Sequence, residues 1–453
     1  MWSPEVTNVF AFVYYGLYAL QHRGQESSGI SITLPDGRIV SKKGMGVVSD
    51  AFDEVKMMTI NGFSSIGHVR YSTFGSSNVE NAQPLEISSK YGQIALAHNG
   101  NLSNARLLKA KLQDLGSIFQ TNIDSEVILH LLTRSNERHL EEALLDAIQQ
   151  IKGGYALVVI TGDKLIGLRD PDGIRPLCIG KTTEGKYILS SESCGLDAVG
   201  AEYLRDVDAG EMVVISKDGL ESVHFAKNKK LPCSFEYIYF ARPDTTMDGI
   251  DVYKVRHKSG QLLWEQNKVE ADVVIGVPDS GLPASIGFSE ASGIPYGMGL
   301  IKNKYIGRTF IKPSQDLREK AVSVKLNALK PILENKRVVV IDDSIVRGTT
   351  SRRLVRILRE AGATQVHFRV ASPPVKWPCF LGIDTPNKDE LVANHMTNDE
   401  LCEWIEADSL EFLSIENLKA ALHGENFCFG CLTGSYPVQT PEKLEEAASC
   451  RLV

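Results

Sequence analysis

The sequence predicts two halves of different fold class: an α+β half, followed by an α/β half built on a parallel sheet. Up to about residue 225, many short strand-like runs occur with only two helix candidates between them, which is typical of an α+β domain. From about residue 270, short apolar runs alternate with helical stretches, which indicates a parallel sheet with crossover helices. A chain of 453 residues is long enough for two or three domains.

The first half contains short runs rich in β-branched and other strand-forming residues. These predicted strands are residues 29–33, 94–97, 155–160, 187–190 and 211–215. Helices are predicted near 103–115 and over 125–135, and Asp124 is placed to cap the second of them.

In the second half, the predicted strands are residues 273–275, 338–341 and 366–370, and the predicted helices are 282–292 and 350–362. We therefore expect four regions along the chain. These are residues 1–225, a connection over 226–260, the α/β domain over 261–385, and a more helical and charged region over 386–453.

The composition is that of an ordinary globular protein, with 43% hydrophobic and 23% charged residues. The formal net charge of −7 argues against a general role in binding nucleic acid or membrane surfaces. The apolar stretch 9–15 has no cationic flank and is too short to span a bilayer, so we expect a cytoplasmic protein. Eight cysteines in a long chain without a secretory signal are not a disulfide framework, and some of them are candidate metal ligands.

The most informative stretch is Val338–Ser351, where two carboxylates, Asp342 and Asp343, follow an apolar strand. A turn rich in Gly, Ser and Thr comes next, and then a basic helical start. Ligands of open α/β sheets bind where such a strand passes into such a helix, and the exposed N–H groups there bind anions. Carboxylates beside a phosphate are explained if they hold ribose hydroxyls or a Mg²⁺ shared with pyrophosphate. An ordinary strand and turn is the alternative, and the length of the run argues against it.

This stretch resembles the phosphoribosyl pyrophosphate loop of type I phosphoribosyltransferases. A second strand-to-turn junction, Gly276–Ala284, resembles the turn that holds the pyrophosphate, and Ser280 with Asp342 and Asp343 is implied to bind Mg²⁺. The cations and aromatics of segment 302–311 suit a lid over an anionic substrate. A helix-capping turn and a solvated surface loop are the alternatives for these two segments. The residues implied to bind phosphoribosyl pyrophosphate are Asp342, Asp343, Ser344, Arg347, Gly348, Thr349, Thr350, Lys302, Lys304, Tyr305 and Arg308.

Four segments of the first half form an ordered set: Tyr14–Glu26, Gly67–Thr73, His98–Leu102 and Thr121–Glu126. Together with the second half, they resemble the glutamine phosphoribosylpyrophosphate amidotransferases over nearly the whole chain. The resemblance implies an αββα sandwich of the N-terminal nucleophile hydrolase type, followed by a type I phosphoribosyltransferase domain and a helical C-terminal region.

The same resemblance implies a glutamine site. Arg70 is expected to bind the α-carboxylate and Asp124 the α-ammonium group. Asn99 and the N–H of Gly100 are expected to form the oxyanion hole. Arg23 is expected to support the end of the site where the nucleophile acts.

No cysteine occurs before Cys178, so the catalytic nucleophile of this family has no counterpart at the start of this sequence. In the family the mature chain begins with a cysteine whose thiol attacks the glutamine amide, with its own α-amino group as the base. We expect that cysteine at or just before residue 1, and the first strand of the domain to be absent. Three explanations are open: the sequence starts inside the true protein, the protein has naturally lost glutaminase activity, or the chain was cut. The intact glutamine-binding residues favour the first. The polypeptide as written is predicted to lack glutaminase activity and to keep ammonia-dependent transfer.

Cys428 and Cys431 form a CxxC pair, which alone fits a zinc half-site, a redox pair or chance. The surroundings of Cys233, Cys379, Cys428 and Cys431 resemble those of the cysteines that bind a [4Fe–4S] cluster in one branch of the family. Four thiolates suit such a cluster and also suit tetrahedral zinc, and the resemblance favours iron–sulfur. We expect a structural cluster that ties the C-terminal region to both domains.

The resemblance implies a glycosyltransferase that converts phosphoribosyl pyrophosphate, glutamine and water to 5-phosphoribosylamine, glutamate and pyrophosphate, the first step of de novo purine synthesis. It also implies feedback inhibition by purine nucleotides and a homotetramer, with no nucleic-acid or membrane partner. An ammonia-only phosphoribosyltransferase and a non-catalytic sensor of phosphoribosyl pyrophosphate are the alternatives. The intact 302–311 segment and the lack of a basic helix-turn-helix argue against the sensor.

Overall fold

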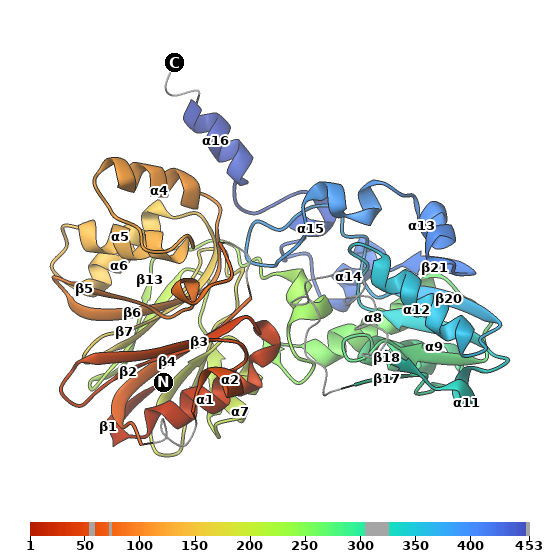
Figure 1. Cartoon of the computed structure of the whole chain (residues 1–453), viewed down its shortest axis with the longest axis horizontal. Coiled ribbons are helices and arrows are strands. Elements are labelled where there is room, and N and C mark those ends of the chain that lie inside the picture. The colour runs from red at the N-terminus through yellow and green to blue at the C-terminus, as the bar shows by residue number, and fades with distance from the viewer. Residues whose placement is uncertain (54–58, 72–74, 304–325, 450–453) are drawn as a thin grey trace.

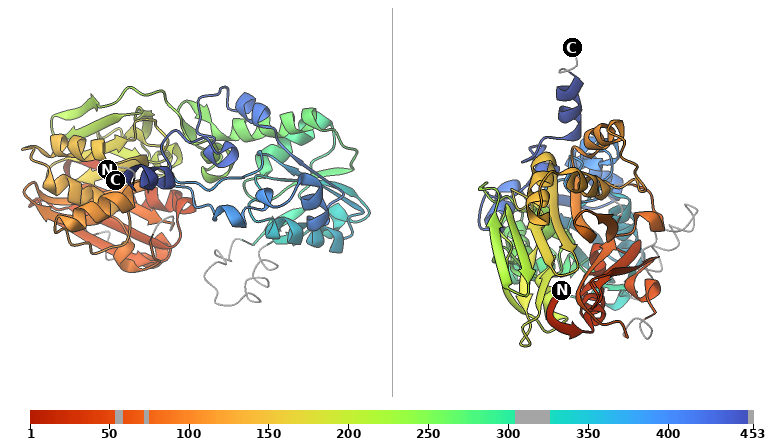
Figure 2. Two further views of the ribbon diagram at one scale, coloured as in Figure 1. Left: turned by 90° about the horizontal axis from the view of Figure 1, so that it is seen from above. Right: turned by 90° about the vertical axis from the view of Figure 1, so that its left-hand side faces the viewer.

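The computed structural model describes residues 1–53, 59–71, 75–303 and 326–449, which form two lobes joined by a central segment (Figure 1). The two lobes lie side by side (Figure 2). The first lobe ends with β13 (Gly219–His224), and the second begins with α8 (Val252–Gln266). Within the described residues, we find no helix that is both long and apolar enough to cross a membrane.

The first lobe contains two stacked antiparallel sheets. The seven-stranded sheet has the order β11 (Glu202–Asp206), β9 (Cys178–Lys181), β10 (Tyr187–Ser190), β1 (Trp2–Thr7), β4 (Gly62–Arg70), β2 (Ser27–Thr33) and β3 (Ile39–Met45). The six-stranded sheet has the order β13, β12 (Glu211–Ser216), β8 (Leu165–Arg169), β7 (Gly153–Ile160), β6 (Gly92–Leu102) and β5 (Leu85–Ser89). Buried apolar side chains of the two sheets, such as Trp2, Ile66 and Ile160, pack together between them.

Helices cover the outer face of each sheet, so the lobe is an αββα sandwich, as the family resemblance implies. On the seven-stranded sheet these are α1 (Val9–Ala19), α2 (Val48–Ala51) and α7 (Ser193–Asp197). On the six-stranded sheet they are α4 (Ala105–Asp114), α5 (Ser125–Arg134) and α6 (Leu140–Gln150). The amphipathic α5 buries its apolar side chains against the sheet because they recur at helical spacing.

Residues Trp2–Thr7 occupy an inner position of the seven-stranded sheet, where we expected no strand. Trp2 lies opposite Tyr187 of β10 on one side and Ser64 of β4 on the other. Its side chain is buried between the two sheets, and burial of a large aromatic ring favours this pairing. The expectation that the first strand is absent is therefore wrong.

The second lobe is built on a four-stranded parallel sheet in the order β16 (Val273–Gly276), β19 (Arg337–Asp342), β20 (Gln365–Val370) and β21 (Ser409–Phe412). One face packs against α8, α9 (Leu282–Ser292) and α14 (Ile415–Ala421). The other face packs against α12 (Thr349–Glu360) and α13 (Asn398–Ile405). The predicted strands and helices of this lobe are confirmed. Strand β21 was not predicted, and it comes from the region expected to be helical.

Smaller elements complete the second lobe and the junction. A hairpin of β17 (Leu300–Lys302) and β18 (Leu326–Ala328) precedes α11 (Lys330–Leu333). The central segment contains the π-helical turn η3 (Glu236–Phe240) and the short pair β14 (Thr246–Met247) and β15 (Ile250–Asp251). Helix α15 (Gly430–Thr433) lies at the junction, and α16 (Pro441–Ser449) projects away from both lobes (Figure 1).

One hydrophobic cluster spans the junction between the lobes. It joins Ile174 of the first lobe to Phe235 and Tyr237 of the central segment and to Leu381 and Phe427 of the C-terminal region. Because these side chains are almost fully buried, the lobes share a core at this point. This shared core fixes the central segment and the C-terminal region against the first lobe.

Candidate active sites

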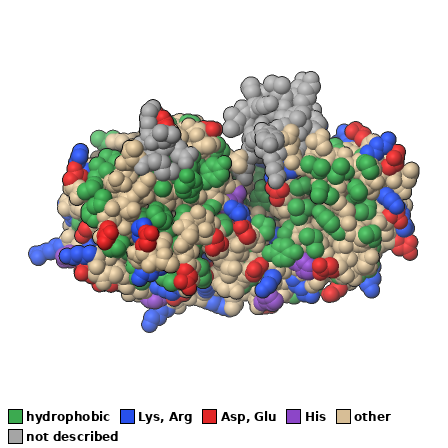
Figure 3. Space-filling model, turned by 90° about the horizontal axis from the view of Figure 1, so that it is seen from below, with side chains coloured by type: hydrophobic (Ala, Val, Ile, Leu, Met, Phe, Trp, Pro, Cys, Tyr) green, Lys and Arg blue, Asp and Glu red, His purple; other side chains and the backbone are tan. Residues whose placement is uncertain are grey.

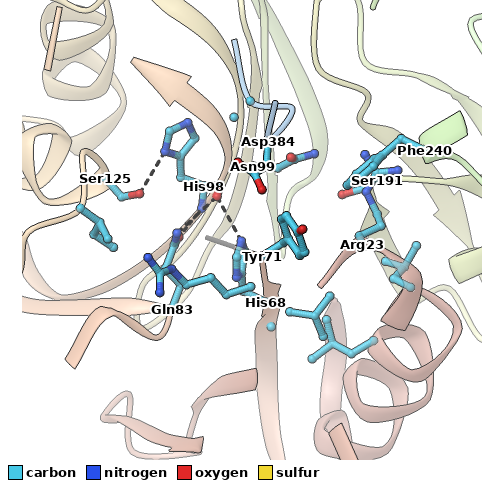
Figure 4. A pocket seen from close by; sticks show the side chains of 18 of the residues that line it. Arg23, His68, Tyr71, Gln83, His98, Asn99, Ser125, Ser191, Phe240 and Asp384 are labelled. Carbon is cyan, nitrogen blue, oxygen red and sulfur yellow. Dashed lines mark hydrogen bonds between the residues drawn. The ribbon is translucent and has the colours of Figure 1, made fainter. Parts of the chain in front are cut away.

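The five residues predicted to bind glutamine line one pocket of the first lobe (Figure 4). Strand β4 carries Arg70, and β6 carries Asn99 and Gly100. Asp124 directly precedes α5, and Arg23 ends the short helix η1 (Gln21–Arg23). Three elements of the sandwich and one loop thus bring together residues that are up to about a hundred positions apart.

Asn99 and Gly100 offer hydrogen-bond donors to the pocket. Asn99 Nδ2 is buried, and no acceptor lies within hydrogen-bond reach of it among the described residues. Gly100 has a φ of 140°, and a Cβ at this position would lie 2.0 Å from the carbonyl oxygen of Gly154. Only glycine therefore fits where β6 turns its backbone into the pocket. Such an arrangement suits the binding of an oxygen that gains negative charge.

Arg70 and Asp124 are both buried in the pocket wall. Arg70 Nη1 donates to the carbonyl oxygen of Ser76 at 3.1 Å and to the carboxylate of Glu26, while burial lowers the pKa of Arg70. Asp124 Oδ2 accepts from the backbone N–H of Leu102 at 2.8 Å. Asp124 stands at the N-cap position of α5 as predicted, but its side chain accepts from no backbone N–H of the helix and instead holds the end of β6.

Two histidines that the sequence analysis did not single out also line the pocket (Figure 4). His98 Nδ1 lies 3.0 Å from Ser125 Oγ, and His68 Nε2 lies 3.2 Å from the carbonyl oxygen of His98. Burial lowers the pKa of His68 to about 3 and also lowers that of His98, so both rings are neutral near pH 7.

The second lobe supplies part of the pocket wall through a segment that contains Gly382 and Asp384. Gly382 has a φ of 111°, and a Cβ there would lie 2.7 Å from the Cα of Gly100. Next to this contact, Asn101 Nδ2 donates to the carbonyl oxygen of Phe380 at 2.9 Å. The segment therefore packs directly on the strand that carries the predicted oxyanion hole.

In the second lobe, the two predicted strand-to-turn junctions lie side by side at the carboxyl ends of β16 and β19. The backbone N–H of Val277 donates to the carbonyl oxygen of Ile341 at 2.9 Å. A Cβ on Gly281 would lie 2.6 Å from that same oxygen, so the close approach requires glycine. Gly348, with a φ of 75°, leads into α12, where Thr349 and Thr350 are exposed.

Asp342 and Asp343 are both buried at this edge. Asp343 accepts from Ser344 Oγ at 2.6 Å and from Ser280 Oγ, so the three residues predicted to bind Mg²⁺ lie together. Burial and the neighbouring Asp343 raise the pKa of Asp342 well above its ordinary value, and burial raises that of Asp343. Two buried carboxyl groups that disfavour each other's ionisation suit a site for a divalent cation.

The predicted cationic ligands of this site are paired with carboxylates. Arg347 Nη2 lies 2.9 Å from Glu390 Oε2, and Lys302 Nζ lies 2.5 Å from Asp279 Oδ2. All four side chains are at least partly exposed. Lys304, Tyr305 and Arg308 lie outside the described residues.

Cys233, Cys379, Cys428 and Cys431 come together at the junction of the lobes. The backbone N–H of Cys428 donates to Pro232 at 2.9 Å, and that of Trp377 donates to Cys431 at 3.0 Å. Burial raises the pKa of Cys431, and the other three cysteines raise it further. Three distant segments therefore bring the four thiols into one neighbourhood.

A buried ion cluster, which the sequence analysis missed, lies between this neighbourhood and the glutamine pocket. Glu236 Oε1 accepts from Arg23 Nη2 at 2.6 Å and from Arg175 Nη2. Arg23 also pairs with Glu192 and stacks on Phe240, 4.7 Å from the ring centre. Arg23 thus reaches the pocket as predicted, held by acidic residues that come much later in the sequence.

The fold and the two sites define a glutamine amidotransferase joined to a phosphoribosyltransferase. Models of known families match in the same order: a glutamine amidotransferase domain over residues 68–198 and a phosphoribosyl transferase domain over 252–372. The chain is 48% identical to the amidophosphoribosyltransferase of Bacillus subtilis over 447 residues, 96% of this chain and 92% of that one. It is 47% identical to that of Archaeoglobus fulgidus, covering 97% of both chains.

A solved structure agrees with these relatives. The glutamine phosphoribosylpyrophosphate amidotransferase of B. subtilis complexed with ADP and GMP superposes with a TM-score of 0.89 at 48% identity, covering 95% of each chain. This chain belongs to the amidophosphoribosyltransferase family, and it is an enzyme, a glycosyltransferase.

Proposed function

We propose that the enzyme converts phosphoribosyl pyrophosphate, glutamine and water to 5-phosphoribosylamine, glutamate and pyrophosphate, as the first step of de novo purine synthesis. The observation that carries this proposal is the pocket of the first lobe, whose wall is completed by the second lobe at Gly382 and Asp384. Nitrogen released from an amide in that pocket appears next to the lobe that has the phosphoribosyl site.

In the second lobe, nitrogen would displace pyrophosphate at the anomeric carbon of ribose. The transition state has oxocarbenium character, so the ribose must be held in position and water excluded. We infer that Asp342 and Asp343 hold the ribose hydroxyls, and that the turn from Ser344 to Thr350 binds the 5-phosphate at the start of α12. Mg²⁺ held by Ser280 and the two carboxylates would neutralise the leaving pyrophosphate.

In the first lobe, we infer that Arg70 binds the α-carboxylate of glutamine and Asp124 its α-ammonium group. Asn99 Nδ2 and the N–H of Gly100 would stabilise the oxyanion of the tetrahedral intermediate. The lack of an acceptor for Asn99 Nδ2 among the described residues supports this role, because a buried donor without a partner costs about 1–3 kcal/mol.

We infer that the four cysteines hold a [4Fe–4S] cluster. Four thiolates from three separate segments suit a cuboidal cluster, which would act as a structural link between the lobes.

Anaerobically purified protein is expected to be brown and to contain about four iron and four sulfide per chain. Cys431→Ser should lose most of this iron, since it removes one of four ligands. Cys402→Ser, in a half-buried cysteine of α13 away from the four, is the matched control and should keep it. Iron and labile sulfide would be measured by chemical assay. Colourless protein that contains zinc would contradict the cluster.

We also infer a cytoplasmic homotetramer that purine nucleotides inhibit, with domains at residues 1–225, 261–385 and 386–453 joined by 226–260. The B. subtilis structure contains ADP and GMP by its title, which supports nucleotide control. Hydrophobic side chains are exposed on one face of the second lobe (Figure 3), and such a surface supports assembly. Tyr296, Met298 and Ile301 are among the exposed hydrophobic residues of this lobe.

The test of this function is pyrophosphate release from phosphoribosyl pyrophosphate by anaerobically purified protein. Ammonium at alkaline pH is expected to support it, because only the second lobe is then needed. Glutamine would be supplied in a parallel assay, and product there would support the complete reaction and overturn the expectation that the polypeptide lacks glutaminase activity. No release with either nitrogen source would contradict the proposed function.

A further inference from the structure

Arg175 is buried without enough hydrogen-bond acceptors. Its side chain has 0% exposure, and Nη2 pairs with Glu236. Among the described residues, no acceptor lies within reach of Nε or Nη1. An unpaired buried donor costs about 1–3 kcal/mol, and two on one charged group cost more. The geometry therefore calls for a further acceptor beside this guanidinium group.

Two of the four cysteines, Cys233 and Cys428, are close to Arg175. The backbone N–H of Cys233 donates at 3.2 Å to the carbonyl oxygen of Ile174, the residue before Arg175. The positive charge of Arg175 therefore lies near enough to these two thiols to interact with them. A thiolate-bound iron–sulfur cluster carries net negative charge and offers sulfur acceptors, which suits the two unpartnered N–H groups.

We propose that Arg175 is a positioning residue of the four-cysteine site: its Nε–H and Nη1–H donate to cluster sulfurs, and its Nη2–H, through Glu236, fixes Arg23 in the glutamine pocket. This inference rests on the proposed cluster. Arg175 and Arg23 share one oxygen of Glu236, a residue of 1% exposure. Buried charges need their partners, so a shift of Arg175 requires Arg23 to adjust. Arg23 in turn lines the pocket.

Arg175→Lys tests the sulfur contact, because lysine keeps the positive charge and loses the planar set of donors. The anaerobic variant is expected to have a more negative cluster reduction potential than the wild type, since hydrogen bonds to sulfur favour the reduced cluster. Loss of cluster absorbance in a chelator should be roughly tenfold faster. Arg369→Lys is the matched control: Arg369 is also buried with an unpartnered Nε among the described residues, but it lies in β20. The cluster reduction potential of Arg369→Lys should equal that of the wild type.

The connection to the pocket is tested by glutamine binding, measured by calorimetry before and after the cluster is removed. In the wild type, removal should raise the Kd for glutamine several-fold. In Arg175→Lys it should have a smaller effect, because the path through Glu236 is already broken. This comparison also separates Arg175 from the segment of Cys379, which packs on Gly100 independently. If cluster removal raised the Kd for glutamine equally in the wild type and in Arg175→Lys, the connection through Arg175 and Glu236 would be overturned.

A wild-type potential and chelation rate in Arg175→Lys would overturn the sulfur contact while leaving the cluster in place. Wild-type protein without iron and sulfide would instead overturn the cluster itself, and this inference with it. If the lysine variant does not fold, Arg175→Gln serves as the second variant. It removes the charge and keeps an N–H donor, and the same negative shift in potential is expected.

Discussion

Asp343→Asn is expected to lower kcat/KM for ammonia-dependent phosphoribosylamine formation by roughly a hundredfold, because it weakens both positioning and charge stabilisation in the transition state. Asp343 is 8% exposed, and its two oxygens accept from Ser280 and Ser344 at the edge where β16 and β19 end. An amide removes the negative charge that would attract Mg²⁺ and replaces one acceptor with a donor. The measurement is the initial rate at saturating ammonium while phosphoribosyl pyrophosphate and Mg²⁺ are varied.

Asp272→Asn is the matched control for this variant. Asp272 lies at the opposite end of the same sheet, where Oδ1 accepts from Arg337 Nη2 at 3.0 Å and Oδ2 from the backbone N–H of Arg337 at 2.8 Å. It is a paired carboxylate next to a strand, but it is remote from the carboxyl ends where the site lies. Its variant should retain wild-type kcat/KM. If Asp343→Asn also did so, the assignment of the ribose site to this edge would be wrong.

The second lobe could be predicted well from the sequence because its signals are local. The four apolar residues Val338–Ile341 are buried on both faces of a parallel sheet, and that environment produces a continuous β-branched run. Carboxyl ends of adjacent parallel strands meet at one edge, so Ser280 and Asp343 could be placed together before any contact was known. Strand β21 was missed because Ser409–Phe412 is a short edge strand with alternating burial.

The glutamine pocket could be predicted only in part. The ordered motifs of the first half located Arg70, Asn99 and Asp124, but nothing local marks Gly382 or Asp384 as residues of the same pocket. Their positions depend on packing between segments about 280 residues apart. Arg175 and Glu236 were missed for a related reason. A charged residue looks the same in a sequence whether it is exposed or paired in the interior.

Arg70→Gln is expected to raise the Kd for glutamine by roughly a hundredfold. A guanidinium group binds a carboxylate through two charge-assisted hydrogen bonds, each worth about 1.5–3 kcal/mol. The side chain introduced by Arg70→Gln has neither the positive charge nor the paired N–H donors that form these two bonds. Arg70 is only 4% exposed in the pocket wall, so water can compensate little of the lost binding energy. Calorimetric titration with glutamine measures the effect, and Arg70→Lys, which keeps the charge alone, should show an intermediate loss.

Two further measurements separate glutamine recognition from general damage to the fold. Arg38→Gln changes an exposed arginine of the same lobe that is paired with Asp36 at 2.7 Å, and its Kd for glutamine should not change. Ammonia-dependent phosphoribosylamine formation by Arg70→Gln should also be unchanged, because that reaction needs only the second lobe. Unaltered glutamine binding in Arg70→Gln would mean that the α-carboxylate is held elsewhere. A parallel loss of ammonia-dependent activity would mean instead that Arg70, through its bond to Ser76 and its pairing with Glu26, mainly stabilises the lobe.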